Sequence, residues 1–458
     1  MWRWQRVCLL SGGLGFAAAL AVDAAAALLV LLASLTPIFF CTVLLRAVAL
    51  RRFFAVRDEG GDVTATGFRS GEEDLPFYSI LVPVFREWQV VGELVEALDR
   101  LDWPRDRLDI LFVTEAPDEE TRQALERSLR PQTMRIIVVP PGEPQTKPRA
   151  LMYALPEARG AYVVVFDAED EPEPDQLRLA YARFRDGGQK VGCVQARLNI
   201  YNVHESWLAR QFTLEYTALF DAILPALQAL GLPVPLGGTS NHFRREVLEN
   251  CGGWDPYNVT EDADLGIRLA RLGWQVEVLP STTWEEAPAQ FGVWFRQRTR
   301  WLKGWMQTCL VHLRRPGALW RELGPRAFLG FVILLGGLIL SALVHPLVYG
   351  VAAWSLWTGN WAWLLPGAEG AGVAWSLGVF NLAAAYVFGA GLAALAVRRR
   401  GFAGLARHAV LIPVYWLLIS AAAYGALAGL IFRPYRWQKT DHSGRWRRRE
   451  RGSIGTPT

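Results

Sequence analysis

The sequence predicts an α/β domain, with a mostly parallel sheet, inserted between N-terminal and C-terminal membrane-spanning helices. Apolar residues make up 52% of the 458 residues, yet 20% of the chain is charged. The long apolar runs lie near the two ends, and between them short Val/Ile/Leu-rich strands alternate with amphipathic helices. Such alternation is typical of a sheet covered by helices on both faces.

Residues 7–50 are almost wholly apolar, about twice the roughly 20 residues that one span needs. Interruptions at Asp23 and at Thr36-Pro37 predict two helices with a break near Asp23. One long helix with a re-entrant start is the alternative. Four arginines follow, which places the next segment in the cytoplasm by the positive-inside rule: Arg46, Arg51, Arg52 and Arg57. We assign residues 1–52 to the membrane and 53–74 to a linker.

The α/β domain is expected at residues 75–315. Strands are predicted at 77–82, 108–113, 134–139 and 161–166, and helices at 90–101, 119–129 and 175–184. Ligands of such sheets bind beyond the carboxyl ends of the strands.

Residues 316–433 are again apolar, with segments at 328–357, 373–397 and 409–432, and residues 434–458 form a basic tail. A cytoplasmic tail requires an even number of crossings here, so either the first segment is a hairpin broken at His345-Pro346 or the last lies along the interface. A tail this basic suits attraction to anionic lipid, whereas a net charge of +4 does not indicate nucleic acid. The five cysteines lack paired spacing, which indicates neither disulfides nor zinc.

Two acidic clusters carry candidate chemistry. Asp167, Glu169 and Asp170 directly follow the strand at 161–166, and carboxylates at this edge suit Mg²⁺ or Mn²⁺ on a diphosphate leaving group. A solvated acidic turn is the alternative. Glu261 and Asp262 follow Thr260 at the start of a predicted helix, where the dipole stabilises an ionised base. Simple capping of the helix is the alternative there.

Two further clusters lie closer to the C-terminal helices. Gln297 and Arg300 share a helix face, Arg300 suits a pyrophosphate, and Trp301 offers a flat surface for a sugar ring. An interfacial helix with a tryptophan belt is the alternative, and both can hold at once. Residues 437–444, which include Trp437, follow the last apolar segment, where a juxtamembrane anchor is the alternative.

In this order the clusters resemble the signatures of the polysaccharide-synthase branch of glycosyltransferase family two, which includes cellulose and hyaluronan synthases. They look most like bacterial exopolysaccharide synthases. The resemblance implies donor contacts from Pro83, Phe85, Glu87, Glu115, Lys147, Arg149, Asp167, Thr440 and His442. It implies metal ligands among Asp167, Glu169 and Asp170, with the choice between the last two open, and a base at Asp262 beside Glu261. It implies acceptor or leaving-group contacts from Gly238, Thr239, Ser240, His242, Gln297, Arg300, Trp301 and Trp437.

The resemblance further implies a glycosyltransferase-A-like fold and inverting transfer from a nucleotide diphosphate sugar, expected to be a UDP-sugar, with Mg²⁺ or Mn²⁺. The acceptor would be a growing polysaccharide, exported across the plasma (inner) membrane with or without an accessory export subunit. Two alternatives stay open: transfer of a single sugar to a membrane lipid, and a non-catalytic receptor or scaffold. No nucleic-acid partner is expected.

Overall fold

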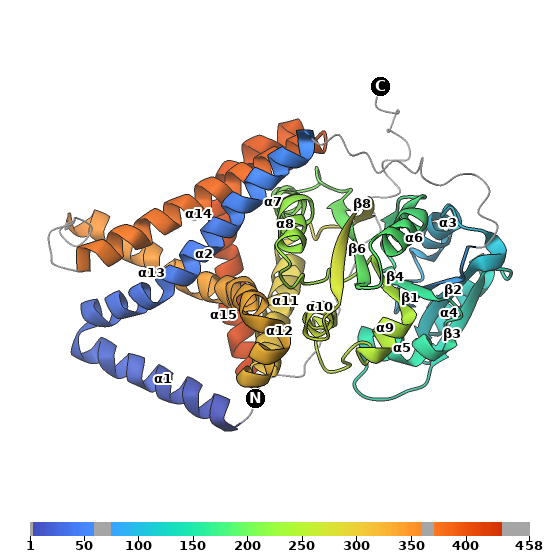
Figure 1. Ribbon diagram of the computed structural model, residues 1–458, viewed down its shortest axis with the longest axis horizontal. Coiled ribbons are helices and arrows are strands. Elements are labelled where there is room, and N and C mark those ends of the chain that lie inside the picture. The colour runs from blue at the N-terminus through green and yellow to red at the C-terminus, as the bar shows by residue number, and fades with distance from the viewer. Residues whose placement is uncertain (1–2, 59–74, 360–370, 433–458) are drawn as a thin grey trace.

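The computed structural model describes residues 3–58, 75–359 and 371–432. An α/β domain lies on the right of Figure 1, and long helices from both ends of the chain lie on the left. The α/β domain is therefore continuous in sequence, and helices before and after it pack together beside it.

The domain is built on one eight-stranded sheet in the order β3-β2-β1-β4-β7-β6-β8-β5. Its strands are β1 (Tyr78–Val84), β2 (Leu108–Glu115), β3 (Met134–Val139), β4 (Tyr162–Val165), β5 (Glu171–Pro172), β6 (Val191–Ile200), β7 (Asn241–Arg244) and β8 (Gln275–Glu285). Strands β1 to β4 are parallel, but β7 is antiparallel to both of its neighbours, β4 and β6. The sheet is thus mixed, and its parallel half carries the strands that the sequence predicted.

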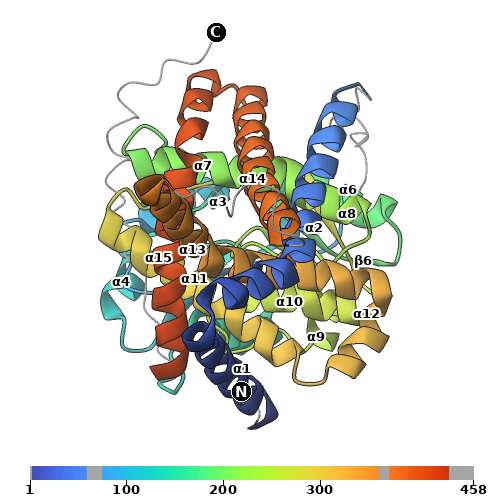
Figure 2. The ribbon, with the colours of Figure 1, turned by 90° about the vertical axis from the view of Figure 1, so that its left-hand side faces the viewer.

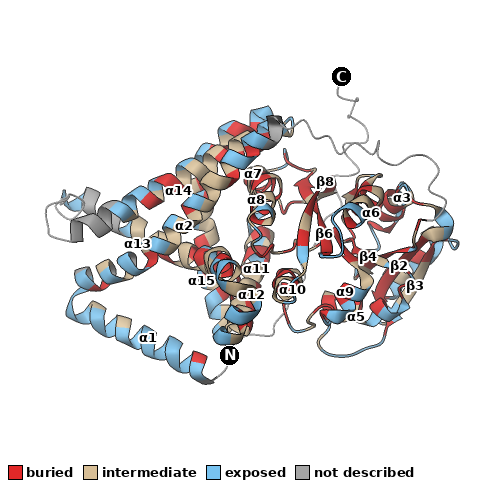
Figure 3. Cartoon of the chain, viewed as in Figure 1, coloured by how far each residue is buried: buried red, intermediate tan, exposed pale blue. Residues whose placement is uncertain are grey.

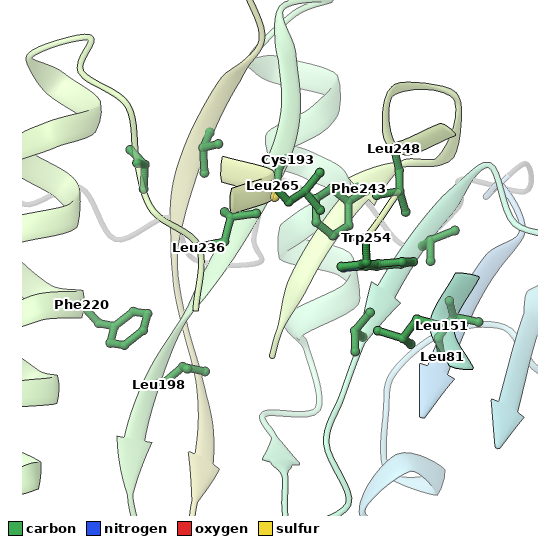
Figure 4. Packing of buried hydrophobic residues seen from close by; sticks show 14 of the residues in the cluster. Leu81, Leu151, Cys193, Leu198, Phe220, Leu236, Phe243, Leu248, Trp254 and Leu265 are labelled. Carbon is green, nitrogen blue, oxygen red and sulfur yellow. The ribbon is translucent and has the colours of Figure 1, made fainter. Parts of the chain in front are cut away.

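Helices cover both faces of the sheet, as the apolar strands require. The helices of the domain are α3 (Val91–Asp99), α4 (Glu119–Ser128), α5 (Lys147–Ala154), α6 (Gln176–Asp186), α7 (Trp207–Ala218), α8 (Leu224–Ala229), α9 (Arg245–Asn250), α10 (Glu261–Arg271) and α11 (Phe291–His312). Successive residues of β1 alternate between faces: Ile80 and Val82 pack in one core with α3, and Leu81 packs in the other with α5, α9 and α10. Figure 4 shows this second core, with Leu81, Leu151 and Leu248 around Trp254.

The two N-terminal helices are α1 (Arg3–Val22) and α2 (Ala24–Asp58). The break falls at Asp23, whose carboxylate accepts a hydrogen bond from the backbone N–H of Ala26 and so caps α2. Most of α1 is exposed in Figure 3, and α2 lies beside α14 in Figures 1 and 2. Helix α2 continues through Pro37 without a break.

The C-terminal helices are α12 (Pro316–Phe331), α13 (Gly337–Thr358), α14 (Ala371–Arg399) and α15 (Ile412–Phe432). A kink at Gly324, whose φ is +73°, divides α12. Helix α13 runs through Pro346, so the hairpin broken at His345-Pro346 that the sequence left open is not found. Among the described residues, five helical segments are long and apolar enough to cross a membrane: Trp4–Val22, Leu29–Ala55, Pro316–Gly350, Leu377–Arg399 and Ala403–Phe432.

Buried ion pairs join these helices to the α/β domain. Arg298 of α11 makes a two-pronged contact, at 2.7 and 2.5 Å, with Glu215 of α7, and Tyr415 of α15 donates its hydroxyl to the same carboxylate at 2.8 Å. At the end of α14, Arg400 contacts Asp221 twice at 2.6 Å. Because bidentate arginine–carboxylate pairs fix direction as well as distance, α11 is held in one orientation against α7, and the hydroxyl of Tyr415 ties α15 to the same pair.

Candidate active site

A cavity of about 200 Å³ lies at the carboxyl ends of β1, β2 and β4, where the sequence placed the ligand. It brings together residues from clusters far apart in the chain. The predicted residues that line it are Pro83, Phe85, Glu87, Glu115, Lys147, Asp167, Glu169, Gly238, Thr239, Glu261, Asp262, Gln297, Arg300 and Trp301.

Four predicted residues lie behind the lining. Arg149 is 3.6 Å from the carboxylate of Glu115, and Ser240 donates its hydroxyl to Thr283 at 2.7 Å. His242 is fully buried between Tyr78 and Gln176, and burial lowers its pKa to about 3. These side chains support the cavity from outside. Trp437, Thr440 and His442 lie outside the described residues.

Asp170, the fourth of these residues, is turned away from the cavity. Its carboxylate accepts hydrogen bonds from the backbone N–H of Asp167, at 2.6 Å, and from the hydroxyl of Thr239. Burial, together with the charges of Asp167 and Glu169, raises its pKa well above the usual range. Asp170 therefore ties the acidic turn to the loop at Gly238 and Thr239, and of the two candidates left open Glu169 is the one that faces the cavity.

Lys147 joins the acidic turn to the opposite loop. Its ammonium group lies 2.5 Å from the carboxylate of Asp167 and donates to the carbonyl of Gly238 at 2.7 Å. Burial alone would lower the pKa of Lys147, but the charges of Asp167 and Glu261 outweigh it and raise the pKa. Lys147 thus stays charged and presents a cation to the cavity.

Two acids of α10, Glu261 and Asp262, line the cavity. Asp262 accepts a hydrogen bond from the N–H of Ala263 at 2.7 Å, and a Cβ on Gly238 would lie only 3.3 Å from its carboxylate. Burial raises the pKa of Asp262, and burial with the adjacent Asp262 charge raises that of Glu261 to about 7. The side chain of Thr260 makes no capping hydrogen bond, so capping alone does not explain this cluster.

Helix α11 supplies the far wall. Gly304 allows the helix to approach Thr260, since a Cβ there would collide with the threonine side chain. Among the described residues, the side-chain oxygen of Gln297 and the Nε of Arg300 are buried without a hydrogen-bond partner. Trp301 stacks on Tyr216, with ring centroids 6.3 Å apart. Buried polar atoms of this kind are costly unless a ligand satisfies them.

Two residues flanking the cavity have left-handed backbone conformations that non-glycine residues rarely adopt. Arg86 has φ +55° and Ser240 has φ +58°. The backbone N–H of Arg86 donates to Asp118 at 2.5 Å, and that of Ser240 donates to the carbonyl of Val165 at 2.8 Å. Strain held by such contacts is typical of ligand-binding loops.

Glu285, at the end of β8, also lines the cavity, and the sequence analysis missed it. One of its oxygens is buried with no hydrogen-bond partner in the described part of the chain. Burial, and then the charges of Asp170, Glu169 and Asp167, raise its pKa well above the usual range. The signal that could have identified it is the acidic pair Glu285-Glu286 directly after an apolar and β-branched strand.

The lining carries a surplus of acid. Seven acidic residues face the cavity, Glu87, Glu115, Asp167, Glu169, Glu261, Asp262 and Glu285, against two basic ones, Lys147 and Arg300. Within the described ranges no three His, Cys, Asp or Glu side chains converge as a ready metal site. Mg²⁺, however, is usually held by one or two carboxylates, with substrate phosphates and water as the other ligands. Asp167 and Glu169 fit that pattern.

Together, the mixed sheet and the cavity at its strand ends define a nucleotide-sugar-binding domain of the glycosyltransferase-A type. Residues 76–304, half of the chain, match the family described as "Glycosyltransferase like family 2", and the chain belongs to that family.

The chain is 30% identical over 242 residues to "Probable glycosyltransferase YdaM" of Bacillus subtilis, covering 52% of this chain and 57% of that protein. It is also 30% identical over 241 residues to the "Beta-monoglucosyldiacylglycerol synthase" of Trichormus variabilis, covering 52% and 50%. The matches thus span about half the length of these curated relatives.

Among solved structures, the fold is similar to that of the mannosyltransferase PcManGT from Pyrobaculum calidifontis, determined with GDP-Man and Mn²⁺. The TM-score is 0.51 at 18% identity, over 87% of this chain and 99% of that one. At this identity the likeness concerns the fold.

Proposed function

We propose that this protein is a membrane-embedded, metal-dependent, inverting glycosyltransferase that uses a nucleotide diphosphate sugar. The observation that carries the proposal is the single cavity in which Asp167, Asp262 and Arg300 meet, although almost a hundred residues separate the first from the second. The family membership of residues 76–304 supports the same reaction class.

In the proposed reaction Asp262 takes the proton of the acceptor hydroxyl as its oxygen attacks the anomeric carbon. The new C–O bond forms on the face opposite the nucleotide, and the bond from the anomeric carbon to the diphosphate oxygen breaks with its electron pair on the diphosphate. Arg300 and Lys147 stabilise the charge of the leaving diphosphate, and Trp301 and Gln297 position the sugar. A raised pKa suits Asp262 to this task because a stronger base is a better proton acceptor.

Asp167 and Glu169 would hold Mg²⁺ or Mn²⁺. The cation supplies charge neutralisation at the diphosphate. Its fit rests on the donor set: two carboxylates at one strand end, within a lining that has an excess of negative charge. The Mn²⁺ in the structure of PcManGT, a protein of similar fold, supports this choice of ion. A UDP-sugar is the proposed donor, with Glu115 and Glu87 on the side of the nucleotide.

The first test is release of nucleotide diphosphate by the purified full-length chain. We expect release from one UDP-sugar in a screen of radiolabelled nucleotide sugars, and we expect chelation with EDTA to stop it. Asp167→Asn should lose turnover and Mn²⁺ affinity together, whereas Asp175→Asn, at the half-buried residue that directly precedes α6 outside the cavity, should lose neither. No release from any donor, with or without acceptor, would favour the non-catalytic scaffold.

The proposed acceptor is a growing polysaccharide, exported through the membrane by this chain alone or with an accessory subunit. A relative in Arabidopsis thaliana that is 26% identical to this chain, a "Probable glucomannan 4-beta-mannosyltransferase 10", supports a polysaccharide as the acceptor. The second candidate is addition of one sugar to a membrane lipid, favoured by the diacylglycerol named in the T. variabilis relative. A ladder of products on a gel supports the first candidate, and a single glycolipid in the organic extract supports the second.

We place the chain in the plasma (inner) membrane as a multi-pass protein with its α/β domain in the cytoplasm. The five apolar helical segments support the crossings, and Arg51 and Arg52 support the orientation. Three of the segments follow the domain. A cytoplasmic basic tail then requires one of the three to lie along the bilayer surface.

A further inference from the structure

A second cavity, of about 40 Å³, lies among α2, α13 and α14, within the apolar segments. The described residues that line it come from all three helices, and the polar ones are Thr36, Thr42, Arg46, Ser341, His345 and Asn381. One of them is an arginine, and none is acidic. The cavity takes no part in the proposed sugar transfer, and its lining shares no residue with the active site.

Aromatic rings hold Arg46 in place. Its guanidinium carbon lies 4.9 Å from the centre of the Trp416 ring, and Tyr386 and His345 complete the aromatic group. The ring centroids of Tyr386 and Trp416 are 4.9 Å apart, and those of His345 and Trp416 are 5.9 Å apart. A cation–π contact directs a guanidinium group but leaves its charge uncompensated.

No carboxylate pairs with Arg46 in the described part of the chain. The titratable groups that face it are Tyr386 of α14 and His345 of α13, and neither is a carboxylate. Arginine within an apolar span is costly, and such residues are found paired or facing a polar cavity. Arg46 therefore needs an anion.

The rest of the lining supplies hydrogen-bonding groups for a head group. Asn381 donates to the carbonyl of Thr36 at 3.3 Å, but its side-chain oxygen is buried with no partner among the residues described. The side-chain oxygen of Ser341 lies 3.3 Å from the Nδ1 of His345. Arg46 and Ser341 thus present a cation and a hydroxyl that match a phosphate, and Asn381, at the level of Thr36, presents an unsatisfied acceptor deeper in the bundle.

The depth of Arg46 matches a phospholipid head group. Arg46 lies five residues before Arg51, which at the helical rise is about 7.5 Å along α2. Arg51 and Arg52 are exposed, and Arg399 of α14 donates to the carbonyl of Phe53, so this level marks the basic edge of the helices beside the α/β domain. Deeper in the bundle the lining includes Phe39, Val348 and Leu382, which offer apolar contacts to an acyl chain, beside the pair of Thr36 and Asn381.

We propose that this cavity binds the phosphate head group of an anionic phospholipid from the leaflet that faces the α/β domain. The inference rests on the proposal that α2, α13 and α14 cross the membrane. The lipid would join these three helices by compensating the charge of Arg46. Because the site is separate from the active site, lipid binding is measurable without donor, acceptor or cation.

The test is thermal unfolding of the purified full-length chain in phosphatidylcholine bicelles with a rising fraction of phosphatidylglycerol. A ligand that binds the folded state raises the midpoint according to its affinity. We expect Arg46→Gln to weaken the apparent affinity for phosphatidylglycerol about tenfold or more, since a charge-assisted contact to phosphate is lost. Arg52→Gln, on the same helix but outside the cavity, should respond as the wild type does.

An equal response of Arg46→Gln and the wild type to phosphatidylglycerol would overturn the proposal. Should Arg46→Gln not fold, Asn381→Leu keeps the charge but fills the cavity, and an unchanged response of that variant would overturn it equally. Inorganic phosphate in phosphatidylcholine alone is expected to give no stabilisation, and full stabilisation by it would replace the lipid by a free anion. Resistance to extraction by alkaline carbonate tests the membrane crossing itself, and nucleotide release tests the transferase, so each failure is separately visible.

Discussion

The two cavities of this protein have opposite imbalances of charge. The active-site cavity has seven acidic and two basic residues in its lining, whereas the cavity among the membrane helices has one arginine and no acid. Three other charged pairs among the described residues compensate each other within the chain: Asp264 with Arg268, Arg298 with Glu215, and Arg400 with Asp221. Burial alone therefore does not mark a ligand site here. An uncompensated charge is the feature that the two proposed sites share, and its sign is opposite to that of the cation proposed for one site and of the phosphate proposed for the other.

The largest expected effect is that of Asp262→Asn. An amide cannot accept the proton of the acceptor hydroxyl, so we expect turnover to fall by roughly 10²–10⁴-fold. The other six acids of the lining stay in place, and the affinity for Mn²⁺ and UDP should remain near that of the wild type. Steady-state release of UDP, with calorimetric titration of UDP and Mn²⁺, measures both quantities. If the variant keeps most of its turnover, the base has been assigned wrongly.

Asp264→Asn tests a compensated acid two residues further along α10. Asp264 is buried, and it accepts hydrogen bonds from Arg268 at 2.7 Å and from His312 of α11 at 3.0 Å. Removing its charge leaves Arg268 without its buried partner, so we expect the free energy of unfolding to fall by about 3 kcal/mol. Mn²⁺ affinity should change little. Denaturant unfolding in detergent, compared with metal titration, separates the two effects.

The same residue predicts a dependence on pH. Burial would raise the pKa of Asp264, but the hydrogen bond from His312 and the charge of Arg268 outweigh it, and the pKa is lowered. A lowered folded-state pKa contributes stability above the unfolded-state value, near 3.9, and this is lost as pH falls through the folded-state pKa. Wild-type stability should therefore fall in acid more steeply than that of Asp264→Asn. Parallel curves for the two proteins would contradict this.

Glu285→Gln tests the surplus of acid directly. A cation beside Asp167 and Glu169 favours ionisation of Glu285, so replacing this acid by an amide should weaken Mn²⁺ binding by about 10-fold or more, the size of effect seen when outer partners of a metal site are removed. Glu286→Gln is the matched control, because Glu286 is adjacent in sequence but does not line the cavity. Titration with Mn²⁺ followed by electron paramagnetic resonance measures the affinity without turnover. Equal affinities of the two variants would show that Glu285 contributes nothing to the cation.

Much of this site could be predicted from the sequence because its residues stand in motifs at strand and helix ends. Asp167 and Asp262 are examples, since each directly follows or begins a regular element. The features that could not be predicted depend on which way a side chain points in the folded domain. Nothing in the local pattern shows that Asp170 turns inward to Thr239 while Glu169 faces the cavity. Glu285 was missed because an acidic pair after a strand is common, and only the pairing of β8 with β6 brings it to the site.

The cavity at Arg46 could not be predicted for the same reason. Arg46 was predicted to be one of four arginines that orient a helix, and the sequence could not show that, unlike Arg51 and Arg52, it faces inward among three helices. The even number of crossings predicted after the domain rested on the charge of the tail, and because three long apolar segments follow the domain, that prediction requires one of them to lie along the bilayer surface. The sequence predicts where a residue lies along a helix, but packing determines which neighbouring helix its side chain contacts.

The smallest expected effect is that of Tyr415→Phe, which tests a compensated cation against Arg46. The hydroxyl of Tyr415 donates to Glu215 at 2.8 Å and accepts from Arg298 at 3.0 Å and from Trp294 at 3.2 Å. Its removal should lower the free energy of unfolding by about 1 kcal/mol, the worth of a typical hydrogen bond, because the pair of Arg298 and Glu215 persists. Since that pair is already neutral, the response to phosphatidylglycerol should match that of the wild type. If phosphatidylglycerol stabilised this variant differently from the wild type, anionic lipid would be binding to the helix bundle as a whole rather than to the single uncompensated charge at Arg46.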